Sequence, residues 1–88
     1  MERQDPIYLN IRAAVPEMKV TIAVLHQDGR YIARILDYLI TQDGRTKDEA
    51  IAHAIQTYQE LKQEYPLKKV PIDKNYYPGW EFVQKDVN

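Results

Sequence analysis

The feature that most constrains the fold is a tight turn, Asp28-Gly29, set between two segments of regular hydrophobic pattern. Met18 to His26 alternates with a period of two and is rich in β-branched residues, a pattern typical of a strand. Aspartate and glycine tolerate the positive φ that a two-residue hairpin turn requires. We therefore expect Arg30 to Leu36 to return as the second strand of an antiparallel hairpin.

The two-residue loop also predicts which residues face each other across the hairpin. It places Val24 opposite Ala33 and Ile22 opposite Ile35, so the apolar faces of the two strands coincide. A shift of one residue would invert one face, so this agreement independently supports the hairpin. The other face of the hairpin is also unusually apolar, so either another segment covers it or it forms an interface. We expect an interface that joins copies of the chain in a homo-oligomer. That face carries Thr21, Ala23, Leu25, Ile32, Arg34 and Leu36.

A third strand and a helix are expected next. Tyr38 to Gln42 forms a short apolar segment that is followed by a turn. Thr46 has the properties of a helix N-cap, and Glu49, three residues later, completes a capping box. The helix is predicted at about 47–65, because Pro66 cannot continue its hydrogen-bond ladder. Its apolar positions recur at a helical spacing: Ala50, Ile51, Ala54, Ile55, Tyr58, Leu61 and Tyr65.

The part of the chain after the helix completes the predicted architecture. Leu67 to Ile72 is compatible with a fourth strand, which Pro71 would confine to a sheet edge. The predicted fold class is α+β: a small β-β-β-α-β domain with a three-stranded antiparallel sheet, one packed helix and this fourth edge strand. We divide the chain into an N-terminal arm (1–17), the folded domain (18–72) and an aromatic-rich C-terminal tail (73–88).

Composition narrows the function. The chain has 88 residues, the size of one domain, and a net charge of −1, so it lacks the strong basic field of a non-specific nucleic-acid binder. It has no cysteine and only two histidines, which leaves no thiolate chemistry and few metal ligands. We expect no metal and no cofactor. The sequence has no apolar run of about 18 residues and begins with polar residues, so we expect a soluble cytoplasmic protein without a membrane partner.

The histidines do not suggest a catalytic site. His26 and Asp28 stand close enough in sequence to form a pair beside the hairpin turn. A solvent-exposed histidine, cross-paired with Tyr31, is the simpler interpretation of His26. His53 falls away from the apolar stripe of the predicted helix, so we expect it on the helix surface.

The other charged residues have structural explanations as well. Asp48 and Glu49 suit the first turn of a helix, where carboxylates complement the helix dipole, and Asp37 suits a turn. No convergent catalytic set remains, so we predict that the chain is not an enzyme. Four basic residues are compatible with a small patch for RNA phosphates or an acidic partner, although an ordinary solvated surface explains them better: Arg30, Arg34, Arg45 and Lys47.

The aromatic residues near the C-terminus are the strongest candidates for partner binding. Aromatic side chains are enriched among the residues that dominate protein–protein interfaces. The alternative is that some of them cap the core or belong to a last strand. The candidates are Tyr76, Tyr77, Trp80 and Phe82.

The stretch MKVTIAVLHQDGRYIARILDYLITQDGRTKDEAIAHAIQTYQEL contains a set of short motifs. A hairpin turn made of an acidic residue and a glycine comes first, followed by a strand with Tyr and Ala two positions apart. A Thr-Gln pair and a helix whose first turn contains Glu-Ala come next. The residues are Asp28, Gly29, Tyr31, Ala33, Thr41, Gln42, Thr46, Glu49, Ala50 and Ala54. Together they resemble the N-terminal domain of the HicB antitoxin family.

The resemblance implies a fold similar to a truncated ribonuclease H core without its catalytic carboxylates, which agrees with the absence of acids from Val20 to Leu25. Family members bind and inhibit a small mRNA-cleaving toxin of the HicA type, commonly as dimers or tetramers. The resemblance thus implies a non-enzymatic antitoxin that acts by protein–protein contact. The alternative is an orphan HicB-like inhibitor or adaptor of another nuclease or defence system. Only 22 residues follow Pro66, too few for the DNA-binding module of many family members, so we expect no direct DNA binding.

Overall fold

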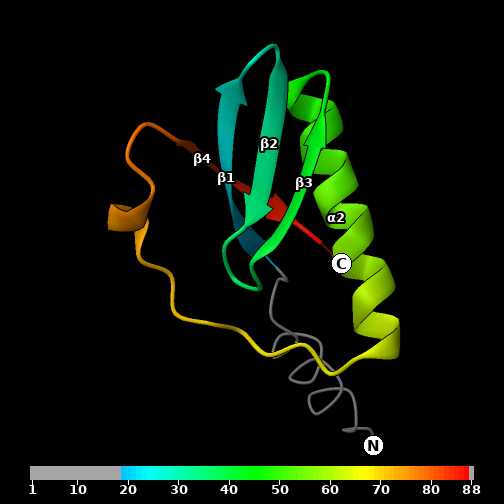
Figure 1. Cartoon of the computed structure of the whole chain (residues 1–88). Helices are drawn as coiled ribbons and strands as arrows, with labels where there is room; N and C mark the ends of the chain where they lie inside the picture. Colours follow the sequence, from blue (N-terminus) through cyan, green and yellow to red (C-terminus); the bar gives the residue numbers. More distant parts are fainter. Residues whose placement is uncertain (1–18, 88) are drawn as a thin grey trace, which may run out of the picture.

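The structure, a computed structural model, describes residues 19–87 and consists of a four-stranded antiparallel sheet with one long helix packed on it (Figure 1). The expected N-terminal arm, 1–17, lies outside the described residues. The strands lie in the order β3-β2-β1-β4 across the sheet. The predicted α+β class is confirmed at this level. The elements are β1 (Lys19–Gln27), β2 (Arg30–Ile35), β3 (Ile40–Gly44), helix α2 (Lys47–Glu64), the short 3-10 helix η1 (Lys74–Tyr76) and β4 (Glu81–Asp86).

The hairpin between β1 and β2 forms at the predicted turn. Both turn residues have positive φ, 53° at Asp28 and 77° at Gly29, as the turn type requires. The predicted register is confirmed, because Ile22 lies opposite Ile35. The apolar residues that alternate along both strands therefore share the face that α2 covers.

Helix α2 begins and ends where its local sequence indicates. The Thr46 hydroxyl accepts a hydrogen bond from the N–H of Glu49 at 3.0 Å, which confirms the predicted cap. The Glu49 carboxylate reaches back past the cap and accepts the N–H of Arg45 at 2.5 Å, a variation on the usual capping box. The helix stops before Tyr65, which is extended because Pro66 follows it.

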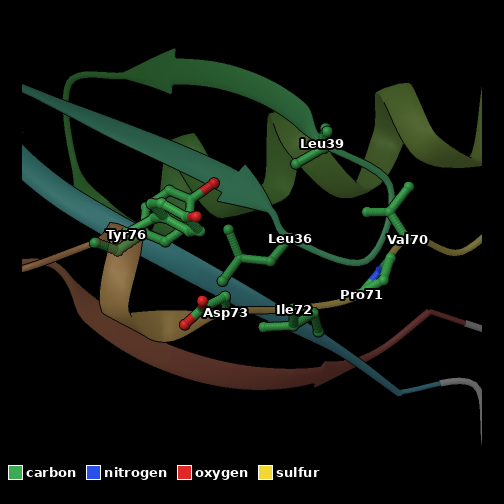
Figure 2. Close-up of a pocket in the computed structure, with 8 residues that line it drawn as sticks. Leu36, Leu39, Val70, Pro71, Ile72, Asp73 and Tyr76 are labelled. Carbon is green, nitrogen blue, oxygen red and sulfur yellow. The ribbon is translucent and has the colours of Figure 1, made fainter.

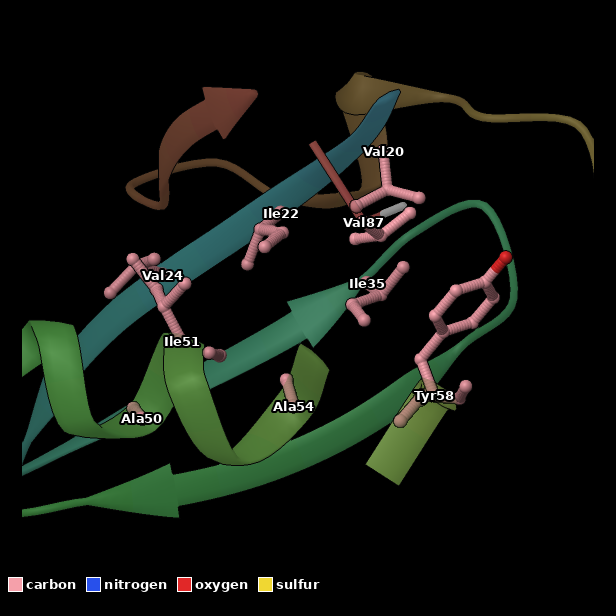
Figure 3. Packing of buried hydrophobic residues seen from close by; sticks show 11 residues of the cluster. Val20, Ile22, Val24, Ile35, Ala50, Ile51, Ala54, Tyr58 and Val87 are labelled. Carbon is pink, nitrogen blue, oxygen red and sulfur yellow. The ribbon is translucent and has the colours of Figure 1, made fainter. Parts of the chain in front are cut away.

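The core lies between α2 and the sheet (Figure 3). Within residues 19–87, α2 packs mainly on β3 and β2, contacts β1 less, and is linked to β4 by an ion pair between Lys47 and Glu81. Ala50 and Ala54 are fully buried, and their small side chains let the helix approach the strands closely. At the end of β3, a Cβ on Gly44 would lie 2.6 Å from the backbone nitrogen of Ala50, so only glycine fits there. Ile35 lies at the centre of this core, and Val87, beyond β4, also packs into it.

The fourth strand is not where the sequence predicted it. Leu67 to Ile72 has no regular secondary structure, and β4 is formed instead by Glu81–Asp86, within the segment assigned to the tail. The reason is that Val70 donates its N–H to the main-chain oxygen of Asp37, at 2.8 Å, instead of to a neighbouring strand. Pro71 also lacks the N–H that a strand would need. Strand β3 begins two residues later than expected because Leu39 occupies a turn, with φ of 58°.

Candidate functional site

The most distinctive surface of the chain is a cavity of about 210 Å³ on the face of the sheet turned away from α2. We call that face the outer face, and we call residues 65–80, which join α2 to β4, the connection. Figure 2 shows that the connection passes over the end of β2 and that apolar side chains meet there. The cavity is lined by Leu36, Leu39, Val70, Pro71, Ile72, Asp73, Tyr76 and Tyr77.

Asp37 fixes the geometry of this cavity. Its side chain lies in the turn after β2 and is almost completely buried, with 5% of the residue exposed. One carboxylate oxygen accepts the N–H of Thr21 in β1 at 2.7 Å. Its main-chain oxygen accepts the N–H of Val70 from the connection, and the Lys69 ammonium lies 3.9 Å from the other carboxylate oxygen. The predicted turn role of Asp37 is thereby confirmed, and the residue also holds the connection against the sheet.

The rim of the cavity is apolar and exposed. Leu39 is 48% exposed, Ile72 38% and Tyr76 78%. Of the four large apolar side chains that are exposed in residues 19–87, these three line the cavity, and only Tyr65 lies elsewhere. Leu39 also adopts a left-handed backbone conformation that is unfavourable for a leucine by roughly 1 kcal/mol. A strained, exposed leucine beside an apolar hollow is typical of a binding surface.

The structure divides the predicted aromatic set into two pairs. Tyr76 and Tyr77 line the cavity, with Tyr76 the more exposed. Trp80 and Phe82 do not line it: the Trp80 ring meets Tyr77 edge-on at 5.5 Å between centroids, and Phe82 lies in β4 opposite Ala23. Of the aliphatic members of the site, sequence reasoning identified only Leu36, as part of the expected oligomer face, and missed Leu39, Val70, Pro71 and Ile72. The available signal was their type, because large apolar residues are unusual in turns.

The predicted oligomer face is partly covered within one chain. Ala23 and Leu36 are buried, with 0% and 1% exposed, so neither offers surface to another copy. Leu25, Ile32 and Arg34 are partly exposed, and a second, more open hollow of about 330 Å³ adjoins Ile32. The Nε atom of Arg34 is buried without a hydrogen-bond partner among the described residues. Self-association through this face stays a prediction.

The titratable residues considered for catalysis have local structural partners. His26 stacks on Tyr31 at 4.3 Å between ring centroids, and both histidines are exposed. His53 Nδ1 lies 2.9 Å from the main-chain oxygen of Asp43, which ties α2 to β3. Among residues 19–87 no three histidine or acidic side chains are grouped as metal ligands.

Two of the four basic residues are paired with acids. Arg30 Nε lies 3.1 Å from a carboxylate oxygen of Asp43, and Lys47 pairs with Glu81 at the start of β4. These pairs neutralise much of the charge that a phosphate-binding patch would use.

Tyr58 is the one described residue with a distinct pKa shift. Burial against the sheet raises the pKa of Tyr58, and the neighbouring Tyr38 and Asp37 raise it further. The two tyrosine rings lie 5.1 Å apart between centroids. Tyr58 is therefore a neutral member of the core between α2 and the sheet.

Comparison of the chain with protein-family models, curated proteins and solved structures gave no match. Across residues 19–87, the structure contains no helix that combines the length and the apolar character needed to cross a bilayer.

Proposed function

We propose that this chain is a non-enzymatic, HicB-like antitoxin that binds and neutralises a small mRNA-cleaving HicA-type toxin in the cytoplasm. On this proposal, the sheet and helix form a truncated ribonuclease H core that serves as a scaffold. The apolar cavity on the outer face is the main toxin-binding site. The observation that carries the proposal is the grouping of exposed Leu39, Ile72 and Tyr76 around one hollow.

The size of the cavity favours a protein partner over a small substrate. Sites for small molecules commonly have volumes of about 300–1,000 Å³. A hollow of about 210 Å³ is below this range and suits one large side chain of a partner protein. Interfaces of this kind are usually centred on a pocket that receives an apolar or aromatic anchor.

The cavity is also held in place before any partner binds. Asp37 bonds to both β1 and the connection, so the two walls of the cavity are joined through a single buried residue. A preformed site loses little conformational entropy on binding. Asp73 stands at the edge, where its side chain accepts the N–H of Asn75 at 2.9 Å and starts η1, which presents Tyr76.

Binding to the toxin encoded beside this gene tests the proposal. Tyr76→Ala should weaken binding about tenfold or more by isothermal titration calorimetry, because it removes the most exposed part of the rim. Tyr65→Ala is a matched control, since Tyr65 is 57% exposed but does not line the cavity. In cells that co-express the toxin, Tyr76→Ala should protect less well than Tyr65→Ala. Equal loss of binding in both variants, or no binding by the unchanged protein, would contradict the proposal.

A second candidate is an orphan HicB-like inhibitor or adaptor of another nuclease or defence system. The location of the cavity favours it, because all of its lining except Leu36 and Leu39 comes from the connection. The connection lies outside the stretch that carries the resemblance, so its partner need not be the family's usual one. If a different nuclease from the same gene neighbourhood binds and Tyr76→Ala weakens that complex, this second function holds.

A further inference from the structure

The two edges of the sheet differ in how they are protected. At the β3 edge, α2 packs alongside the strand and His53 binds the main-chain oxygen of Asp43. At the other edge, within residues 19–87, β4 pairs with no strand except β1, and an ion pair between Glu81 and Lys47 links its first residue to α2. Four of the six β4 residues are exposed: Glu81, Gln84, Lys85 and Asp86. An unpaired strand edge carries a row of backbone donors and acceptors that can pair with another strand.

The sequence of β4 is complementary to itself in one antiparallel register. In an antiparallel pair, two directly opposite residues aim their backbone groups either both toward the other strand or both away from it, which allows only every second register. One allowed register places Val83 opposite Val83 of the second copy and Glu81 opposite Lys85 of the second copy. The two adjacent allowed registers instead place Glu81 or Lys85 opposite Val83. Charge complementarity therefore selects the register centred on Val83.

We propose that two copies of this chain associate through their β4 edges in this register, with Val83 on the two-fold axis. The two four-stranded sheets then become one continuous sheet. A two-fold axis applies each contact twice, so both Glu81–Lys85 pairs form together. Within residues 19–87 Lys85 has no ion pair of its own, and Glu81 already binds Lys47 at the start of α2. Each Glu81 thus lies between a lysine of its own chain and Lys85 of the second copy.

This contact is separate from the cavity. None of the cavity residues belongs to β4, so the dimer leaves both cavities available. The partner is a second copy of the chain, because the complementarity is that of β4 with itself. The inference does not depend on the proposed function and survives if no toxin binds.

Cysteine substitution tests the register directly, because the chain contains no cysteine. Opposite residues of an antiparallel pair have Cα atoms about 4.5–5.5 Å apart, within the usual range for a disulfide. Val83→Cys should therefore form a covalent dimer when diamide oxidises the two thiols, as seen on a non-reducing gel. In the same register, the two copies of residue 84 are offset by two positions and lie about 8 Å apart, which is too far. Gln84→Cys is thus the matched control and should stay largely uncrosslinked.

Charge reversal tests the association in solution without relying on a cysteine. The unchanged protein should show a mass that rises toward a dimer with concentration in sedimentation equilibrium. Lys85→Glu should shift dimerisation to at least tenfold higher concentration, because it places two acids opposite each other. Lys68→Glu, an exposed residue of the connection, makes the same change in charge and should have no effect. A monomer at every concentration, or efficient crosslinking of Gln84→Cys instead of Val83→Cys, would overturn the proposal.

Discussion

Removing the buried carboxylate of Asp37 gives the sharpest test of how the outer face is organised. The residue is 5% exposed, and its carboxylate accepts the Thr21 N–H at 2.7 Å. In Asp37→Ala this N–H has no acceptor and Thr21 is itself buried. An unsatisfied buried donor costs about 1–3 kcal/mol, and hydrogen bonds to charged groups lie at the upper end of that range. The contact with Lys69 adds little, because it is long, at 3.9 Å, and its lysine is 66% exposed.

We therefore expect Asp37→Ala to lower the free energy of unfolding by about 2–3 kcal/mol, measured by urea denaturation. The whole stability of a domain this small is roughly 5–10 kcal/mol, so the loss is large. Asp37→Asn retains an oxygen that can accept the same hydrogen bond and should lose only about 1 kcal/mol. Hydrogen exchange should show faster exchange at the amides of Thr21 and Val70 in Asp37→Ala. A change below about 0.5 kcal/mol, with both amides still protected, would refute this role.

Three further predictions concern single positions. Gly44→Ala should destabilise the fold by about 2 kcal/mol in urea denaturation, because its Cβ would lie 2.6 Å from the Ala50 backbone nitrogen; an unchanged midpoint would contradict this. Leu39→Asn should leave stability unchanged or raise it by up to about 1 kcal/mol, because asparagine tolerates positive φ, yet it should weaken partner binding; a loss of stability would count against strain at Leu39. Because the pKa of Tyr58 is raised in the folded state, the folded protein keeps the phenol proton up to a higher pH than the unfolded chain does. The contribution of Tyr58 to the free energy of unfolding is therefore constant below about pH 10 and falls as the pH rises further. Tyr58→Phe should therefore lose less stability than the unchanged protein between pH 9 and pH 11, and equal losses would exclude the effect.

The sequence predicted the local elements well and the long-range ones poorly. The hairpin register and the helix start followed from Asp28-Gly29 and Thr46, because turn type and capping are decided by a few adjacent residues. The position of β4 did not follow, because Leu67 to Ile72 and Glu81–Asp86 are both short and only partly apolar. The choice between them depends on the bond from Val70 to Asp37, residues 33 positions apart in the chain. No local pattern encodes such a contact.

The same long-range choice created the candidate site. Helix α2 packs beside β3, whereas β4 joins the sheet at the far side of β1. The connection must therefore cross the width of the sheet, and it does so over the outer face, where Ile72 approaches Leu36 and Lys74 lies 5.1 Å above the Phe82 ring. The connection packs on part of the outer face. This is why that face is apolar enough to suggest an interface from the sequence. The connection leaves a hollow open beside Leu39 and Tyr76, where we propose that a partner binds. On that proposal, the aromatic tail contributes to binding through its position over the sheet.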